Sequence, residues 1–203
     1  MKKRIAFREM YSNISEDWDL NKNKVDKIIN KYTEQLITEI LDDTPFTISP
    51  YFMDYRKPEE YCYDLLLGRI VEDLVILWME KYNYVVEKIG NDKDGVIHRK
   101  PMGRITNRPD LRVGDTEIEI QTSSTGKLKV YHVKENKGRH IINNDTILLF
   151  IIGNEYLIID KEVLSGAELK PNPSWGNKEC YWIYPKEYKL IREGCITLTY
   201  INK

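Results

Sequence analysis

The chain has few cysteines, no long apolar run and almost no net charge, and each of these shortages excludes a class of protein. Cys62, Cys180 and Cys195 lie far apart and form no CxxC pair, which argues against a zinc site and against a disulfide framework. No apolar run approaches the roughly 18 residues that span a bilayer. A net charge of −1 over 203 residues excludes a uniformly basic nucleic-acid binder but leaves room for local basic patches.

The start of the chain bears on where the protein is located, and its length bears on how many domains it has. Residues 1–8 are basic, but no apolar signal-peptide core follows them. We therefore expect a cytoplasmic, intracellular protein with no membrane partner. A length of 203 residues suits one domain with one hydrophobic core.

Hydrophobic periodicity predicts an amphipathic helix at 21–42 and a helix that is apolar nearly all round at 58–81. Together with the strands and turns that follow, these helices indicate a mixed α/β domain with a central sheet. The remaining expected elements are a strand at 84–89, a polar loop at 90–108, hairpins at 108–121 and 146–159, a helix at 127–142, a loop at 170–178, and late strands at 180–184 and 195–201.

Residues 108–121 carry the most informative pattern, two short strands joined by a Gly-Asp turn. In the second strand Glu117, Glu119 and Gln121 alternate with isoleucines, so the three polar side chains share one face. Asp110 lies on the neighbouring strand. Like charges side by side on a sheet repel one another, and a divalent cation held by oxygen ligands would remove that repulsion. The hairpin therefore predicts a magnesium site.

Three pieces of this sequence resemble the PD-(D/E)xK nuclease superfamily, which includes restriction endonucleases and Holliday-junction resolvases. They are a GxxxE segment ending at Glu72, the pair Pro109-Asp110, and Glu119-Ile120-Gln121, where the family usually has Glu-x-Lys. The resemblance covers residues 58 to about 152. It implies a restriction-endonuclease-like core, helix-strand-strand-strand-helix-strand with a mixed central sheet flanked by helices. That domain would occupy 58–203, after an N-terminal helical extension at 1–57.

The resemblance also implies roles for single residues. Asp110 and Glu119 would bind one or two Mg²⁺ ions, for which Mn²⁺ can substitute, helped by the main-chain carbonyl of Ile120. Glu72 would be a further or second-metal ligand, although pairing with an arginine is the plain structural alternative. Gln121 departs from the family, because an amide can hydrogen-bond the attacking water but cannot carry a positive charge. The expected catalytic residues are Asp110, Glu119, Gln121 and Glu72.

Two alternatives to this motif stay open. A lysine from the following segment could take the place of the family lysine in space, with Lys127, Lys129 and Lys134 as candidates. The register Glu117-Ile118-Glu119 would instead form an ExE site, as in another subset of restriction enzymes. Both registers contain Glu119.

Basic residues gather on either side of the hairpin, where a polyanionic substrate would need them, because phosphate contacts supply much of nucleic-acid affinity. The aromatic residues Trp175, Trp182 and Tyr184 are expected to pack in a core or interface, with stacking on bases as the alternative. We expect nucleic-acid contacts from Arg99, Lys100, Arg104, Arg108, Ser123, Ser124, Lys127, Lys129, Lys134 and Lys137.

These observations predict an enzyme, a magnesium-dependent DNA endonuclease that hydrolyses phosphodiester bonds and is most similar to type II restriction enzymes of prokaryotes or viruses. We expect a homodimer on double-stranded DNA, with the N-terminal helices serving dimerisation or DNA gripping. One alternative is a structure-specific nuclease similar to Holliday-junction resolvases. The other is a catalytically silent DNA-binding protein that keeps the nuclease fold.

Overall fold

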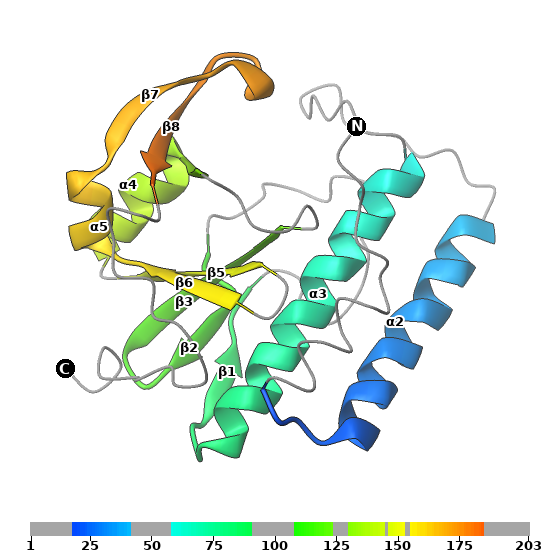
Figure 1. Cartoon of the computed structure of the whole chain (residues 1–203). Helices are drawn as coiled ribbons and strands as arrows, with labels where there is room; N and C mark the ends of the chain where they lie inside the picture. Colours follow the sequence, from blue (N-terminus) through cyan, green and yellow to red (C-terminus); the bar gives the residue numbers. More distant parts are fainter. Residues whose placement is uncertain are drawn as a thin grey trace.

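The computed structural model describes residues 18–41, 58–90, 108–123, 130–144, 146–152 and 155–184 (Figure 1). Within these residues no helix is both long and apolar enough to cross a membrane. The elements in chain order are α2 (Lys22–Leu41), α3 (Pro58–Lys81), β1 (Val86–Lys88), β2 (Leu111–Val113), β3 (Thr116–Ser123), β4 (Tyr131–Lys134), α4 (Glu135–Asn144), β5 (Ile147–Ile152), β6 (Glu155–Ile159), α5 (Lys161–Gly166), β7 (Glu168–Asn172), the 3₁₀ turn Pro173–Trp175, and β8 (Lys178–Ile183).

The strands form two sheets. The central sheet has the order β1-β2-β3-β5-β6 and is mixed, because β3 and β5 run parallel while the other neighbours are antiparallel. Parallel neighbours need a crossover connection, which here contains β4 and α4. A smaller antiparallel sheet has the order β4-β8-β7. The mixed α/β class with a central sheet is confirmed, and the second sheet is an addition that the sequence did not predict.

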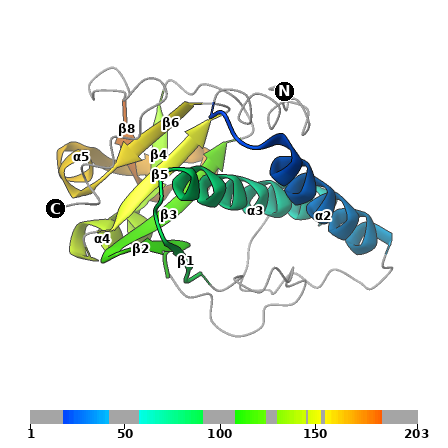
Figure 2. The same cartoon turned by 90° about the horizontal axis from the view of Figure 1, so that it is seen from below.

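Helices cover both faces of the central sheet, as Figures 1 and 2 show. On one face α3 lies between α2 and the sheet, and on the other lie α4 and α5. Strand β5 is buried from both sides: Leu149 and Ile151 join the core beneath α3, whereas Leu148 and Phe150 join the core beneath α4. A strand covered on both faces reads as a continuous apolar run, which explains the sequence of β5.

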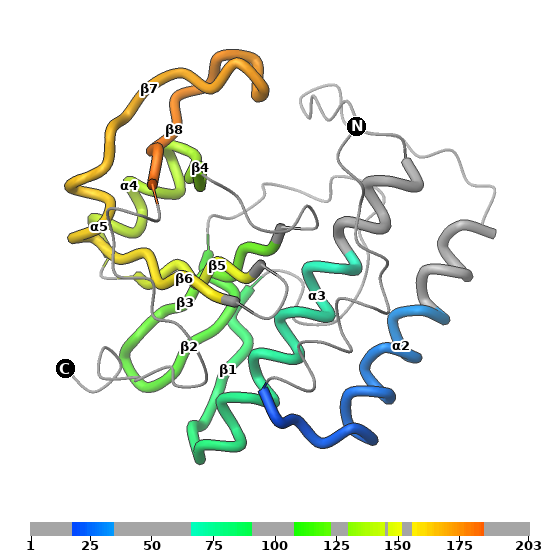
Figure 3. Tube along the Cα trace, viewed as in Figure 1, coloured from blue at the N-terminus to red at the C-terminus, as the bar shows by residue number. Residues whose placement is uncertain are grey.

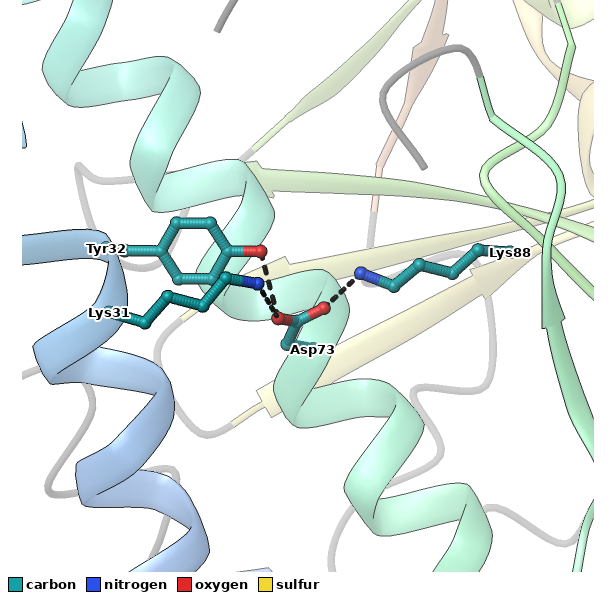
Figure 4. A network of polar contacts seen from close by, with 4 residues as sticks. All are labelled: Lys31, Tyr32, Asp73 and Lys88. Carbon is teal, nitrogen blue, oxygen red and sulfur yellow. Dashed lines mark hydrogen bonds and ion pairs between the residues drawn. The ribbon is translucent and has the colours of Figure 1, made fainter. Parts of the chain in front are cut away.

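A polar contact attaches α2 to the rest of the fold (Figure 4). The Tyr32 hydroxyl donates to Asp73 Oδ2 on α3 at 2.9 Å, and the Lys88 ammonium of β1 pairs with Asp73 Oδ1. Lys31 Nζ lies 3.9 Å from the same carboxylate. Val25 and Tyr32 are buried in the core that α3 shares with the sheet. Helix α2 is therefore packed against α3 and linked to β1 through Asp73.

The two long helices and both predicted hairpins are confirmed, but two local predictions are wrong and one helix was missed. Residues 131–134 form a strand instead of the start of a helix, because they pair with β8 far along the chain. Residues 168–172 form β7, which extends into the loop predicted at 170–178, and Pro171 is tolerated there because β7 is an edge strand. Helix α5, capped by Asp160, was not predicted. Figure 3 traces the chain from β6 through α5 and β7 into β8. The strand expected at 195–201 and most of the loop at 90–108 lie outside the described residues.

Candidate active site

Asp110 stands just before β2 and is held by its main chain from both sides. Its N–H donates to the Ile118 carbonyl at 3.0 Å, and its carbonyl accepts from the N–H groups of Ile89 at 3.0 Å and Gly90 at 3.2 Å. Pro109, which has no N–H, cannot extend the β2 ladder beyond this point. The backbone of Asp110 is thus fixed between β1 and β3 where regular pairing ends.

The Asp110 side chain also contacts β3. Its Oδ2 accepts a hydrogen bond from the main-chain N–H of Ile120 at 2.7 Å. The N–H and C=O of one strand residue point to the same side, so the Ile120 carbonyl faces the same edge as the Asp110 carboxylate. Two oxygen donors are therefore gathered beside Glu119.

Glu119 lies on β3 opposite Leu148 of β5, with Gln121 opposite Phe150. Side chains two apart on a strand share a face, so Glu119 and Gln121 both face the α4 layer, where Leu148 and Phe150 are buried. The Glu119 side chain is 16% exposed. A carboxylate that is this sheltered needs a counter-charge.

The counter-charge is Lys137 of α4, whose Nζ forms an ion pair with Glu119 Oε1. Lys137 was predicted to contact phosphate, and its position beside Glu119 was not foreseen. The next residue of α4 is a glycine, and a Cβ atom at Gly138 would lie 2.4 Å from ring carbons of Tyr181 on β8, so α4 packs closely against the small sheet. A glycine inside a predicted helix was the one available signal of a close approach.

The other carboxylate of the hairpin has a different partner. Glu117 Oε1 accepts from Arg112 Nη2 at 2.9 Å, and Arg112 Nη1 lies 3.5 Å from Glu87 Oε2. The hydrogen bond to Glu117 is the main reason that the pKa of Arg112 is raised. The first carboxylate of the ExE register, Glu117, is thus engaged by an arginine, whereas the second, Glu119, is engaged by a lysine from another element.

Glu72 lies half-buried on α3, the helix that packs on the sheet face bearing Ile118 and Ile120. Its charge is the smallest of the causes that raise the pKa of Tyr32 on α2. Glu119 faces the opposite layer. The structure thus brings Asp110, Glu119 and Gln121 to one hairpin and places Glu72 on the helix behind it.

The donors at the hairpin suit a hard cation. Across the described ranges, no three His, Cys, Asp or Glu side chains cluster as a ready-made metal site. Asp110, Glu119 and the Ile120 carbonyl offer oxygen only. Mg²⁺ is commonly held by one or two carboxylates and keeps several waters, so this small oxygen set fits Mg²⁺ and gives no soft ligand for zinc or copper.

The predicted nucleic-acid contacts are only partly visible. Arg108 is exposed next to Pro109, and Ser123 ends β3. Lys134 is exposed on β4, with its Nζ 5.8 Å from the ring centroid of Trp175. The remaining predicted contacts lie outside the described residues, namely Arg99, Lys100, Arg104, Ser124, Lys127 and Lys129.

The outer face of the small sheet carries an aromatic cluster. His132 and Trp182 pack edge to face with centroids 4.3 Å apart. Lys170 Nζ lies 4.6 Å from the Trp182 ring centroid and 3.4 Å from the Tyr184 hydroxyl. Trp182 donates its indole N–H to the Lys170 carbonyl at 3.2 Å. These aromatic residues are therefore packed among cations at the surface of the small sheet.

Comparisons with protein-family models, with curated proteins and with solved structures find no match.

Proposed function

We propose that this protein is a magnesium-dependent endonuclease that hydrolyses phosphodiester bonds of double-stranded DNA. The observation that carries the proposal is the hydrogen bond from the Ile120 N–H to the Asp110 carboxylate, which holds that carboxylate beside the strand bearing Glu119. The element order also supports it: α3, β1, β2, β3, α4 and β5 follow the order of the PD-(D/E)xK core, with β4 inserted before α4.

Each residue of the site has a role in this proposal. Asp110, Glu119 and the Ile120 carbonyl would hold the ion. The family resemblance implies Glu72 as a further ligand, which would have to reach the ion from α3, on the other face of the sheet from Glu119. When bound, Mg²⁺ polarises the phosphodiester and lowers the pKa of a coordinated water. Gln121 hydrogen-bonds the attacking water and so orients it.

The reaction is an in-line hydrolysis. The water oxygen forms a bond to phosphorus as the bond between phosphorus and the 3′ oxygen breaks. The proton that the water loses is balanced by protonation of the leaving 3′ oxygen. The products carry 5′-phosphate and 3′-hydroxyl ends.

Cutting both strands requires two such sites, and a homodimer on a palindromic sequence places one site at each strand. This arrangement is that of a type II restriction-like enzyme. A structure-specific nuclease is the second candidate, favoured by Glu72 standing four residues after Gly68 on α3. Cleavage of a four-way junction without sequence preference would distinguish it.

The test is incubation of supercoiled plasmid and of a four-way junction with Mg²⁺, Mn²⁺ or EDTA. The variants are Asp110→Asn and Glu119→Gln, with Glu72→Gln to test the further ligand. Glu135→Gln is the matched control, because this α4 carboxylate pairs with Arg139 at 2.7 Å instead of facing the hairpin. We expect metal-dependent cleavage that Asp110→Asn and Glu119→Gln reduce at least about 100-fold and that Glu135→Gln leaves unchanged.

Two results would contradict the proposal. Cleavage that survives Asp110→Asn would place the chemistry elsewhere. Salt-sensitive DNA binding that EDTA does not change, without cleavage in either metal, would indicate a catalytically silent DNA-binding protein.

A further inference from the structure

We infer that Lys137 is an exchangeable cation of this site: it neutralises Glu119 in the absence of metal, and metal binding at Glu119 transfers it toward the substrate phosphate. The inference rests on the proposed function, since it concerns the same carboxylate. It assigns to Lys137 the positive charge that Gln121 cannot supply.

Lys137 and a metal ion would compete for Glu119 for an electrostatic reason. The Lys137 ammonium contacts Glu119 Oε1 at a place where the two side chains are only 32% and 16% exposed. Interactions between charges are stronger where water is largely excluded. A divalent ion bound at the same carboxylate would lie next to the ammonium, and the two cations would repel each other. Lys137 and the metal therefore compete for Glu119.

The Lys137 side chain can leave Glu119 without movement of α4. Lys137 reaches the site from α4, whose close approach to β8 is fixed by Gly138 against Tyr181. A lysine carries its charge on a flexible four-carbon stem. The ammonium can therefore move by several bond rotations while the helix stays in place.

The displaced Lys137 ammonium would need a new anionic partner. Gln121 is two residues beyond Glu119 on the same face of β3. This face is where the family lysine would otherwise stand. A phosphate held at the metal would bring negative charge to this face. The released Lys137 ammonium would then pair with that phosphate.

Another cation on α4 provides the control. Arg139 Nη2 pairs with Glu135 Oε1 of its own helix at 2.7 Å, and the Arg139 side chain is 64% exposed. Arg139→Met removes the same unit of charge from the same helix as Lys137→Met, but from a pair that does not involve Glu119. General changes in net charge should affect both variants alike.

The experiment is calorimetric titration of the full chain with Mn²⁺ in the absence of DNA, followed by single-turnover plasmid cleavage at saturating Mn²⁺. We expect Lys137→Met to bind Mn²⁺ about tenfold more tightly than wild type, which corresponds to about 1.4 kcal/mol, because no ammonium competes with the metal for Glu119. The same variant should nevertheless cleave at least about 100-fold more slowly. Arg139→Met should match wild type in both readouts. Lys137→Gln is a second variant in case Lys137→Met fails to fold, as judged by circular dichroism.

The outcomes separate this inference from the proposed function. If wild type binds Mn²⁺ and cleaves, but the Lys137 variants bind Mn²⁺ with unchanged or weaker affinity, the exchange is wrong and the nuclease proposal stands. If the Lys137 variants bind more tightly and still cleave at the wild-type rate, Lys137 competes with metal but has no role toward phosphate, which also overturns the inference. If wild type neither binds Mn²⁺ nor cleaves, the proposed function itself fails and takes the inference with it.

Discussion

Tyr32 on α2 donates its hydroxyl hydrogen to the Asp73 carboxylate on α3 across an O···O distance of 2.9 Å. Tyr32 is 1% exposed and Asp73 is 9% exposed. Lys88 of β1 pairs with the other oxygen of the same carboxylate. Three elements thus meet at one buried charge, and the N-terminal helix is held by a polar contact as well as by apolar packing (Figure 4).

Removing the hydroxyl should weaken this attachment. Tyr32→Phe keeps the ring in the core but leaves the Asp73 carboxylate with one donor fewer, and a buried polar group that loses its partner costs about 1–3 kcal/mol. We expect that loss in the free energy of unfolding, measured by urea denaturation. Tyr82→Phe is the matched control, because Tyr82 is 46% exposed, and its effect should stay within about 0.5 kcal/mol. Equal effects of the two variants would show that the contact contributes nothing.

The same contact predicts a loss of stability in alkali. Burial is the largest cause that raises the pKa of the Tyr32 phenol, followed by the charge of Asp73, while Arg69 opposes the shift. The folded state therefore favours the neutral phenol. This contribution is fully present below the unfolded pKa of about 10 and is lost as pH rises through the higher folded pKa.

The measurement is the difference in unfolding free energy between wild type and Tyr32→Phe at pH 8 and at several values above pH 10. The phenylalanine variant lacks the titrating group, whereas both proteins share the other tyrosines and the lysines. We expect the difference to shrink above pH 10, by up to about 1.4 kcal/mol per pH unit. A difference that stays constant through this range would rule out a raised pKa at Tyr32.

Local pattern was sufficient for the elements whose partners are close in sequence. The helix at 58–81 and the hairpin around Gly114 follow from apolar periodicity and from a turn residue with φ of 58°. Residues 131–134 are different, because they are extended only through pairing with β8, about 50 residues later. The local sequence pattern therefore wrongly predicted a helix at these residues.

The candidate site, too, could be predicted only in part from the sequence. The hairpin alone placed Asp110 and Glu119 on adjacent strands; the structure has Glu119 on β3 and Asp110 one residue before β2, with its carboxylate bonded to β3. The ion pair between Lys137 and Glu119 could not be predicted, because it depends on the distance between α4 and the sheet. The position of α4 also depends on Gly138 against Tyr181 of the small sheet, a contact between residues more than 40 positions apart. Side chains that meet through packing of separate elements leave no spacing rule in the sequence.

Two helical glycines should respond to alanine in opposite ways. A Cβ atom at Gly138 would lie 2.4 Å from the Tyr181 ring, whereas one at Gly68 meets no described atom within 4 Å. Alanine is favoured over glycine inside a helix by roughly 1 kcal/mol, but overpacking a core costs about 1–3 kcal/mol. We therefore expect Gly68→Ala to raise the unfolding free energy and Gly138→Ala to lower it, as measured by urea denaturation. Stabilisation by Gly138→Ala would show that α4 can move away from Tyr181 without loss.

His132 offers a local test of the small sheet. Burial is the larger cause that lowers the pKa of its imidazole, and the charge of Lys170 is the second. The folded state therefore favours neutral His132, and this contribution to stability is present above the unfolded pKa of about 6.5 and is lost as pH falls. Lys170 is close enough to act because it packs over Trp182, which contacts the His132 ring.

Titration of His132 by NMR separates the two causes. We expect a pKa below about 6.5 in wild type and a partial rise toward that value in Lys170→Met, because burial remains when the charge is removed. Lys178→Met removes a lysine from the same sheet, at an exposed position on β8, and should leave the His132 titration unchanged. A shift of the same size in both variants would trace the effect to net charge instead of to the contact between Lys170 and the aromatic cluster. No shift in Lys170→Met would leave burial as the sole cause.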